Sequence, residues 1–387
     1  MNFLQEQNFV QFVRRNQMKI TRREFLTVAS SMAGLLGLKA TGLMDLQKAF
    51  AGSGDPSVIW LQGQSCTGCS VSLLNSIYFA TIDELLLNTI NLEYHPNLMA
   101  SAGDFAINAA QVARPSNGEL MDLQGEWLQK GPGLSNDLNS DSNVNFVDFG
   151  ALARRGYILV VEGAIPTGAN GDYCGVANGL TMVDAMRRFA PSATHIVAVG
   201  TCATYGGIAA ARPNPTGALG VKDALTYIGV SKPVVNIPGC PIHPDWLVGT
   251  LIDVLTGATL SLDSNGRPTK YYGAIVHNNC QYLSSFNSYY SSELSHANNR
   301  SCLSCHSNSD SDIRGAKVLG ATGCLFALGC KGRQTYCDCS TRKWNSAAKS
   351  QNGINWCVGA GSPCYGCTQP NFPDGMSPFY TLGGGGV

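Results

Sequence analysis

The sequence carries little charge and no excess of either sign. Its 387 residues include 26 basic and 26 acidic side chains, so the formal net charge is zero. Without a basic stripe, the chain is not expected to bind nucleic acid. Disordered chains combine high charge with few apolar residues, whereas 44% of these residues are hydrophobic. No apolar run of about 20 residues follows Ala51, so we expect the chain to have no transmembrane anchor of its own.

The first 51 residues predict a signal peptide that is not part of the fold. Thr21–Leu26 (TRREFL) has a twin-arginine pattern, a moderately apolar stretch follows it, and Ala49–Ala51 (AFA) offers a small-x-small cleavage site. The alternative is the charged start of an amphipathic helix, but all three parts of a leader occur in order. We therefore expect residues 1–51 to direct export of the folded protein to the periplasm by the twin-arginine route.

The remaining chain predicts an α/β fold followed by a smaller domain. Continuous apolar runs alternate with helical patterns, which is typical of a doubly wound parallel sheet. The expected strands are Val58–Leu61, Leu92–Tyr94, Ile158–Glu162, Ile196–Gly200 and Val234–Ile237, and the expected helices are Ser70–Ile77, Met182–Phe189 and Lys222–Ile228. Residues 113–150, which are rich in Asn, Ser, Asp and Gly, are predicted to be a surface insertion. We place the sheet domain at 52–270 and a cysteine-rich domain at 271–387.

The chain has 15 cysteines, an odd number in a protein too large to need disulfides for stability. Cys66 and Cys69 follow the first expected strand, Cys202 the fourth and Cys240 the fifth. A Cys-x-x-Cys pair alone would equally suit a redox dithiol or a zinc site. Loops after parallel strands meet at one edge of the sheet, so these four thiols are expected to converge. Four thiolates are the ligand set of a [4Fe–4S] cluster, which we predict here.

Three stretches around these cysteines resemble the small subunits of nickel–iron hydrogenases. They are Trp60–Ser70 (WLQGQSCTGCS), Gly200–Gly207 (GTCATYGG) and Asn236–Asp245 (NIPGCPIHPD). The resemblance implies a flavodoxin-like sheet domain and an electron-transfer role in a hydrogenase enzyme. H₂ would be oxidised at the nickel–iron site of a separate large subunit. The four-cysteine cluster would be the proximal one and would face that subunit across an apolar interface around Cys66–Ser70 and Cys202–Gly207.

The same resemblance implies that the second domain is organised by two further clusters. His277, Cys280, Cys324 and Cys330 match the family's distal cluster, which is held by one His and three Cys. A neutral imidazole in place of a thiolate should raise that cluster's potential. Electrons would then leave near His277 towards a c-type cytochrome or a membrane quinone-reducing module.

The medial cluster would be held by Cys339, Cys357, Cys364 and Cys367. The ordinary nickel–iron small subunit has proline where this chain has Cys357, and its medial cluster has three irons. A fourth thiolate can hold a fourth iron, so we predict three [4Fe–4S] clusters, as in the nickel–iron–selenium branch. The alternative is a medial [3Fe–4S] cluster with Cys357 as an unligated core thiol.

Some family features are missing. Gly68 and Gly207 stand where oxygen-tolerant relatives carry two extra cysteines, so an ordinary four-thiolate proximal cluster is expected. Ser65 and Val71 stand where many family members carry glutamate, so no proton role is transferred to these positions.

Four cysteines lie outside the three ligand sets. Cys302, Cys305 and His306 form a Cys-x-x-Cys-His pattern for covalent haem c, in an insertion at about 287–316 that also holds His296, a candidate second axial ligand. A Cys302–Cys305 disulfide or idle thiols are the alternatives. Cys174 and Cys337 are expected to be inert core cysteines.

Other functions share part of this pattern. A multi-cluster ferredoxin-like carrier without a hydrogenase partner is the main alternative. The cluster subunit of complex I shares the sheet but has one cluster, no leader and no second cysteine-rich domain. The leader also argues against a cytosolic hydrogen-sensing subunit.

Overall fold

The computed structural model of the protein describes eight stretches of the chain: 57–88, 90–98, 156–177, 180–255, 257–287, 319–320, 323–345 and 353–380. The described residues all belong to one compact unit. The predicted boundary between two domains at 270 stays a prediction. The leader at 1–51, the insertion at 113–150 and the candidate haem residues His296, Cys302, Cys305 and His306 lie outside the described residues.

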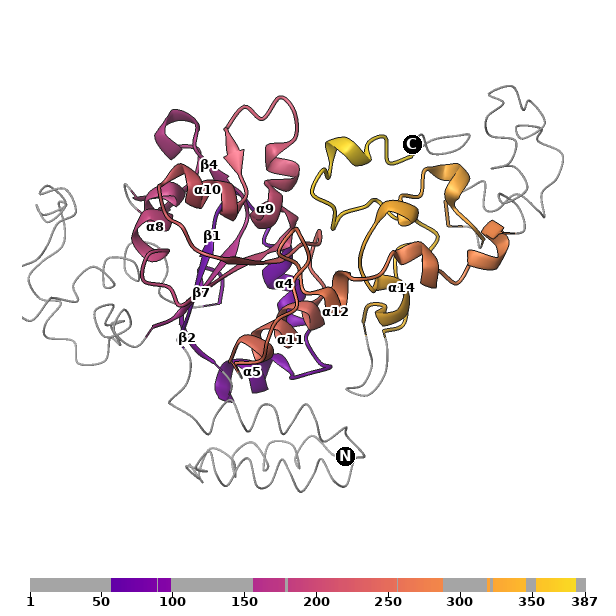
Figure 1. Ribbon diagram of the computed structural model, residues 1–387, viewed down its shortest axis with the longest axis horizontal. Coiled ribbons are helices and arrows are strands. Elements are labelled where there is room, and N and C mark those ends of the chain that lie inside the picture. The colour runs from indigo at the N-terminus through magenta and orange to yellow at the C-terminus, as the bar shows by residue number, and fades with distance from the viewer. Residues whose placement is uncertain are drawn as a thin grey trace, which may run out of the picture. The chain divides into compact units, whose positions relative to one another are not determined.

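The elements follow one another as an alternation of strands and helices, and then as short helical turns (Figure 1). The first part contains β1 (Ser57–Gln62), α4 (Gly68–Leu74), α5 (Ile82–Asn88), β2 (Asn91–Tyr94), β3 (Ile158–Glu162), β4 (Ile165–Pro166), η2 (Gly168–Gly171), β5 (Gly175–Ala177), β6 (Leu180–Thr181), α8 (Met182–Phe189), β7 (His195–Val199), α9 (Gly200–Tyr205), η3 (Gly207–Ala210), β8 (Ala218–Leu219), α10 (Val221–Tyr227), β9 (Val234–Ile237) and α11 (Pro244–Leu255). The second contains α12 (Thr269–Tyr272), η4 (Val276–Asn279), η6 (Phe326–Leu328), η7 (Gly332–Gln334), α14 (Cys339–Arg342) and η8 (Asp374–Met376).

A five-stranded parallel sheet in the order β2-β1-β3-β7-β9 forms the centre of the first part. This confirms the predicted doubly wound parallel sheet, and the order is the flavodoxin-like one. Four of the five strands are almost wholly buried because helices cover both faces, whereas β2, at one edge, is buried only at Tyr94. α8 and α10 lie on one side of the sheet, and α4, α5 and α11 lie on the other (Figure 1). All five residues of β3 are buried, which is why its sequence is continuously apolar until Glu162.

Helix α11 is apolar around most of its circumference, and ten of its twelve residues are buried. A helix of this kind needs partners on all sides. It packs against α4, and its Trp246 indole N–H donates to Asp338 of the cysteine-rich part, at 2.7 Å. α11 therefore joins the sheet to the segments that carry the later cysteines.

Beyond Tyr272 the described residues form short helices, 3-10 turns and isolated bridges such as Ile275–Tyr336 and Trp344–Asn355, but no strand. Segments this irregular bury little apolar surface of their own and are commonly organised by bound metal. Within the described ranges, no helix is both long enough and apolar enough to cross a bilayer.

Candidate metal centres

The four cysteines of the predicted proximal site come from three loops at the carboxyl edge of the sheet. Cys66 and Cys69 lie at the start of α4, directly after β1. Cys202 lies in the first turn of α9, directly after β7, and Cys240 follows β9. Cys69 interacts electrostatically with Cys202 and Cys240, and both of these interact with Cys66. The structure therefore brings all four together, as the parallel topology predicts.

Two glycines keep the space in front of these thiols open. A Cβ on Gly200 would lie 2.5 Å from Cys69 Sγ, and one on Gly207 would lie 2.9 Å from Cys202 Sγ. Both residues also have positive φ, +85° and +53°, which side chains rarely adopt. The backbone thus forms a cradle around sulfur atoms that a larger residue would fill, which fits a bulky inorganic group held there.

Burial disfavours the charged form of these thiols. It raises the pKa of Cys69, with further contributions from the Glu162 carboxylate and the neighbouring thiols. It likewise raises the pKa of Cys240 to about 11, assisted by Cys202 and Cys66. Thiolates at this edge would therefore need a cation to stabilise them, and iron supplies that charge when it displaces the thiol protons.

Glu162 holds the loop of Cys66 and Cys69 in place. This carboxylate ends β3, is 1% exposed and accepts hydrogen bonds from the backbone N–H groups of Cys69 (3.1 Å) and Ser70 (3.3 Å). It also accepts from Ser65 Oγ (3.1 Å) and from the Trp60 indole (3.2 Å). In the sequence, Glu162 is predicted only as the last residue of a strand. The feature that could have indicated its role in holding the loop is a charged residue at the end of an otherwise apolar run.

The two positions that lack the family's glutamates have other roles here. Ser65 donates to Glu162 and accepts from the Thr67 backbone N–H, so it belongs to the same loop network. Val71 is 54% exposed on α4.

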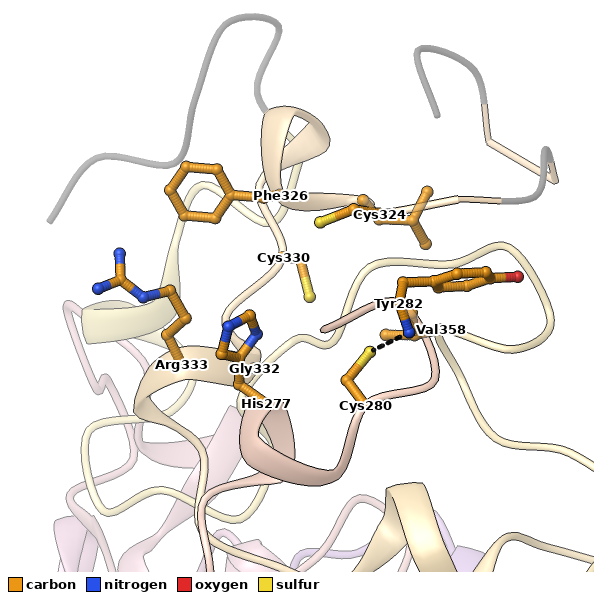
Figure 2. A pocket seen from close by; sticks show the side chains of 10 residues that line it. His277, Cys280, Tyr282, Cys324, Phe326, Cys330, Gly332, Arg333 and Val358 are labelled. Atoms are coloured by element: carbon orange, nitrogen blue, oxygen red, sulfur yellow. Dashed lines mark hydrogen bonds between the residues drawn. The ribbon is translucent and has the colours of Figure 1, made fainter. Parts of the chain in front are cut away.

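The predicted distal ligands surround a common cavity (Figure 2). His277 lies on η4 and Cys280 directly follows it, while Cys324 and Cys330 lie on either side of η6. Their side chains point towards one another across the space shown in Figure 2. Burial, with a smaller contribution from the Arg333 charge, lowers the pKa of His277. The ring is therefore neutral at ordinary pH, the form in which an imidazole binds metal.

The predicted medial ligands also converge. Cys339 starts α14, and its thiol interacts electrostatically with Cys367 and Cys357, while Cys364 interacts with Cys367. Burial raises the pKa of the Cys364 and Cys367 thiols. As at the proximal site, these groups would require iron to become thiolates.

Cys337 is a fifth cysteine beside the medial group. It is 2% exposed, as expected of a core cysteine, and a side-chain hydrogen bond joins it to Cys339. Its neighbours also include Cys357, Cys364 and Cys367. Its position beside the ligands was not predicted from the sequence. Cys174, by contrast, packs partly buried against the core between the sheet and α8.

Two buried donors near the medial thiols have no partner among the described residues: Ser340 Oγ, next to Cys339, and Trp356 Nε1, next to Cys357. Buried donors in native proteins normally find an acceptor. The sulfurs of an iron–sulfur cluster accept such hydrogen bonds. These two donors therefore fit a cluster bound at the medial group.

The spacing of the described thiols is compatible with clusters. None of the thirteen described cysteines forms a disulfide. Within the described ranges, no three His, Cys, Asp or Glu side chains stand close enough to hold one metal ion. Each ligand of a four-iron cluster binds a different iron, so cluster ligands are spaced more widely than those of a single ion.

The three groups adjoin one another in a fixed order. Thr201, beside the proximal Cys202, donates a hydrogen bond from its hydroxyl to the Cys367 carbonyl. The Cys240 backbone N–H donates a hydrogen bond to the Cys367 thiol. At the other end, the Cys364 backbone N–H donates to Cys330 Sγ at 3.4 Å. The medial group thus lies between the proximal and distal groups.

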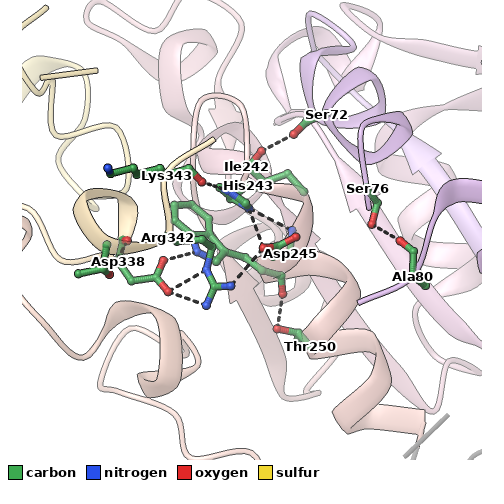
Figure 3. A network of polar contacts seen from close by, with 12 residues as sticks. Ser72, Ser76, Ala80, Ile242, His243, Asp245, Thr250, Asp338, Arg342 and Lys343 are labelled. Atoms are coloured by element: carbon green, nitrogen blue, oxygen red, sulfur yellow. Dashed lines mark hydrogen bonds and ion pairs between the residues drawn. The ribbon is translucent and has the colours of Figure 1, made fainter. Parts of the chain in front are cut away.

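A buried polar network fixes the helix that begins with Cys339 (Figure 3). Arg342 pairs with Asp338 (2.8 Å) and with Asp245 of α11 (3.1 Å). His243 accepts the Asp245 backbone N–H at Nδ1, so its proton lies on Nε2, which donates to the Lys343 carbonyl at 2.6 Å. The network ties both ends of α14 to the sheet part of the protein.

The buried imidazoles of His95 and His243 give stability a pH dependence. Burial lowers the pKa of each to about 4, from 6.5. The unfolded chain binds these protons more readily, so the stabilisation is complete above pH 6.5 and is lost as pH falls from there towards 4. When the pH is lowered from about 6.5 to about 5, we expect the free energy of unfolding to fall by about 2 kcal/mol for each of the two histidines.

Thermal or denaturant unfolding of His243→Gln at several pH values checks this expectation. The variant should lose less stability than the wild type as the pH is lowered. His195→Gln, which changes an exposed histidine at the start of β7, is the matched control and should keep the wild-type slope. Equal slopes in all three proteins would contradict the expectation.

Comparisons with known proteins agree with a parallel-sheet fold that carries three groups of cysteine and histidine ligands. Residues 66–254 match the family model of the 20 Kd subunit of NADH ubiquinone oxidoreductase, and residues 272–380 match that of the C-terminal part of the NiFe/NiFeSe hydrogenase small subunit. The periplasmic [NiFeSe] hydrogenase small subunit of Desulfomicrobium baculatum is 37% identical, over 94% of this chain and 99% of its own length. The periplasmic [NiFe] hydrogenase small subunit 1 of Nitratidesulfovibrio vulgaris is 36% identical over 93% of each chain.

The solved structures give the same result. A crystal structure of the reduced, active Ni-Fe-Se hydrogenase from Desulfomicrobium baculatum contains a chain that is 38% identical, with a TM-score of 0.63. The match covers 85% of this protein and 99% of that chain. Fold, ligand groups and relatives together define an iron–sulfur electron-transfer protein. The chain belongs to the family of nickel–iron hydrogenase small subunits, the electron-transfer subunits of these enzymes.

Proposed function

We propose that this chain conducts electrons from a nickel–iron large subunit through three [4Fe–4S] clusters to an acceptor outside the dimer. The single observation that supports this most directly is the order of the ligand groups, in which the medial group adjoins the other two. The residues proposed as ligands are Cys66, Cys69, Cys202 and Cys240 for the proximal cluster, His277, Cys280, Cys324 and Cys330 for the distal one, and Cys339, Cys357, Cys364 and Cys367 for the medial one. When bound, the clusters supply one-electron redox chemistry. The protein residues hold them and exclude water.

The proposed interface with the large subunit surrounds the proximal group. Val71 and Leu74 of α4 are 54% and 43% exposed, and Ile208 of η3 is 58% exposed. Large apolar side chains exposed together mark protein interfaces more often than free surface. They flank the same loops that carry Cys69 and Cys202, so a catalytic partner covering them would adjoin the proximal cluster.

The export route and the acceptor complete the proposal. The named relatives are periplasmic, which supports twin-arginine export through residues 1–51. Electrons would leave beside His277 to a c-type cytochrome or a membrane quinone-reducing module. The relatives favour this function over a ferredoxin-like carrier that acts without a hydrogenase partner.

Purification from the native source tests the proposal. The chain should co-elute with a larger, nickel-containing protein, show H₂-dependent dye reduction, and carry about twelve irons in its clusters. A stable monomer with no nickel-containing partner would contradict it, as would iron sufficient for only one cluster.

We also propose that Cys302 and Cys305 attach haem c, with His306 as one axial ligand and His296 as the candidate second. The periplasm is where such haem is attached, which supports the pattern. A pyridine haemochrome assay of the purified protein should give the α-band of c-type haem, and Cys302→Ala should abolish it. Absence of that band would contradict the haem proposal and would favour a Cys302–Cys305 disulfide or free thiols.

A further inference from the structure

Arg333 places a positive charge beside the distal ligands (Figure 2). It lies on η7, three residues after Cys330. Its guanidinium carbon is 5.4 Å from the centroid of the Phe286 ring and 5.8 Å from that of Phe326. The two rings meet edge to face with centroids 5.3 Å apart, and Phe286 meets the His277 ring edge to face at 4.4 Å. The same aromatic group therefore holds the guanidinium and packs against the proposed histidine ligand.

No carboxylate of the described residues neutralises this charge. Arg187, Arg267 and Arg342 each form an ion pair with an aspartate, whereas Arg333 forms none in the described part of the chain. Arg333 also lines the cavity that the distal ligands enclose. Arg333 therefore places its charge at the wall of the space between the distal ligands.

A fixed cation at the edge of a cluster changes the cluster's potential. A thiolate-ligated cluster becomes more negative when it accepts an electron, so a nearby cation stabilises the reduced form more than the oxidised form. The guanidinium lies over the Phe286 and Phe326 rings, which fix its position beside His277, although the side chain as a whole is exposed. Solvent therefore screens part of its charge, and the effect on the cluster is a partial one.

We propose that Arg333 raises the reduction potential of the distal cluster and so favours the last internal electron transfer. In that step the reduced medial cluster is oxidised and the distal cluster is reduced. Arg333 is thus an electrostatic residue of the electron exit, acting together with the imidazole ligand, which also makes the cluster less negative. The inference rests on the proposed function, because it requires a cluster between His277 and Cys330.

Redox titration of the intact heterodimer, followed by EPR, tests this inference. Arg333→Met keeps a long apolar side chain between the two rings but removes the charge, whereas Arg333→Lys keeps the charge. At a fixed potential, Arg333→Met should lower the ratio of reduced to oxidised distal cluster about tenfold, which is about 59 mV for a one-electron couple. Arg333→Lys should stay closer to the wild type than to Arg333→Met. Arg187→Met, which removes an exposed charge on α8, is the matched control and should leave the potential unchanged.

The outcomes separate the inference from the function on which it rests. A distal signal with an unaltered potential in Arg333→Met would overturn the inference alone. An equal fall in Arg333→Met and Arg333→Lys would assign the effect to packing around Phe286, and it would also overturn the inference. A wild-type dimer without a third cluster signal would overturn the proposed function, and the inference would fall with it.

Discussion

Cys202→Ala should remove the proximal cluster and stop electron flow from the large subunit. Cys202 is one of four thiols at the carboxyl edge of the sheet, and the other described cysteines lie in the distal and medial groups or apart from the ligand groups. Loss of a ligand should exceed the roughly 10–100-fold cost of losing an outer-shell partner, so H₂-dependent dye reduction should fall by more than about 100-fold. Activity assays and iron analysis measure both effects, with about four irons lost of about twelve.

Cys174→Ala is the matched control for this variant. Cys174 is also a free cysteine packed near the sheet, but it lies outside the three ligand groups. The control should keep its irons and its activity. EPR signals from the medial and distal clusters in Cys202→Ala would show that the chain still folds and pairs. An active Cys202→Ala dimer with a full iron content would remove Cys202 from the ligand set.

Proximal loss should stop the relay because the three groups form a single series. Thr201 and Cys240 contact the segment of Cys367, and Cys364 contacts Cys330. The described residues offer no second group of thiols beside the proximal loops through which electrons could bypass the first centre. The ends of the series differ, since exposed apolar residues flank the proximal group while a cation and a histidine flank the distal one.

The sheet was predictable because four of its five strands are almost wholly buried and are therefore continuously apolar in sequence. β3, β9 and α8 have the predicted bounds, and the other strands agree within about a residue at each end. α4 begins at Gly68 rather than at Ser70. The reason is a contact from far along the chain, because the Glu162 carboxylate accepts the backbone N–H groups of the first turn. The short pairs β4–β8 and β5–β6 were not predicted, since runs of two or three residues carry no periodicity.

The convergence of the proximal cysteines was predictable from topology alone, since parallel strands deliver their following loops to one edge. The distal and medial sets depended on a family resemblance, because irregular segments leave no periodic pattern to read. Three features escaped sequence reasoning: the Glu162 anchor, the position of Cys337, and the Arg342–Asp245 ion pair. The Glu162 and Arg342 contacts join segments 93 and 97 residues apart, and Cys337 meets Cys357, Cys364 and Cys367 of a later segment. Such neighbours are visible only after packing.

Cys357→Pro should convert the medial cluster from four irons to three. If Cys357 is the fourth ligand, its loss leaves three thiolates, and one iron site then has no protein ligand. Iron analysis should show about one iron fewer of about twelve, and the oxidised protein should gain the EPR signal of a three-iron cluster. The medial potential should rise, because losing an iron site normally goes with a higher potential. Proline is compatible here, since the Cys357 N–H donates no backbone hydrogen bond among the described residues.

Cys337→Ala is the decisive control, because Cys337 is the other buried thiol beside the medial group and contacts Cys339 directly. It should retain four medial irons, and Cys357→Ala should reproduce the proline variant without its backbone constraint. If Cys337→Ala lost the iron and Cys357→Pro kept it, the fourth ligand would be Cys337, and Cys357 would be an unligated thiol. If the wild-type protein already gave a dominant three-iron signal, neither cysteine would ligate a fourth iron. Because five cysteines lie at the medial group, this one pair of variants shows which thiol is the fourth ligand of the medial cluster.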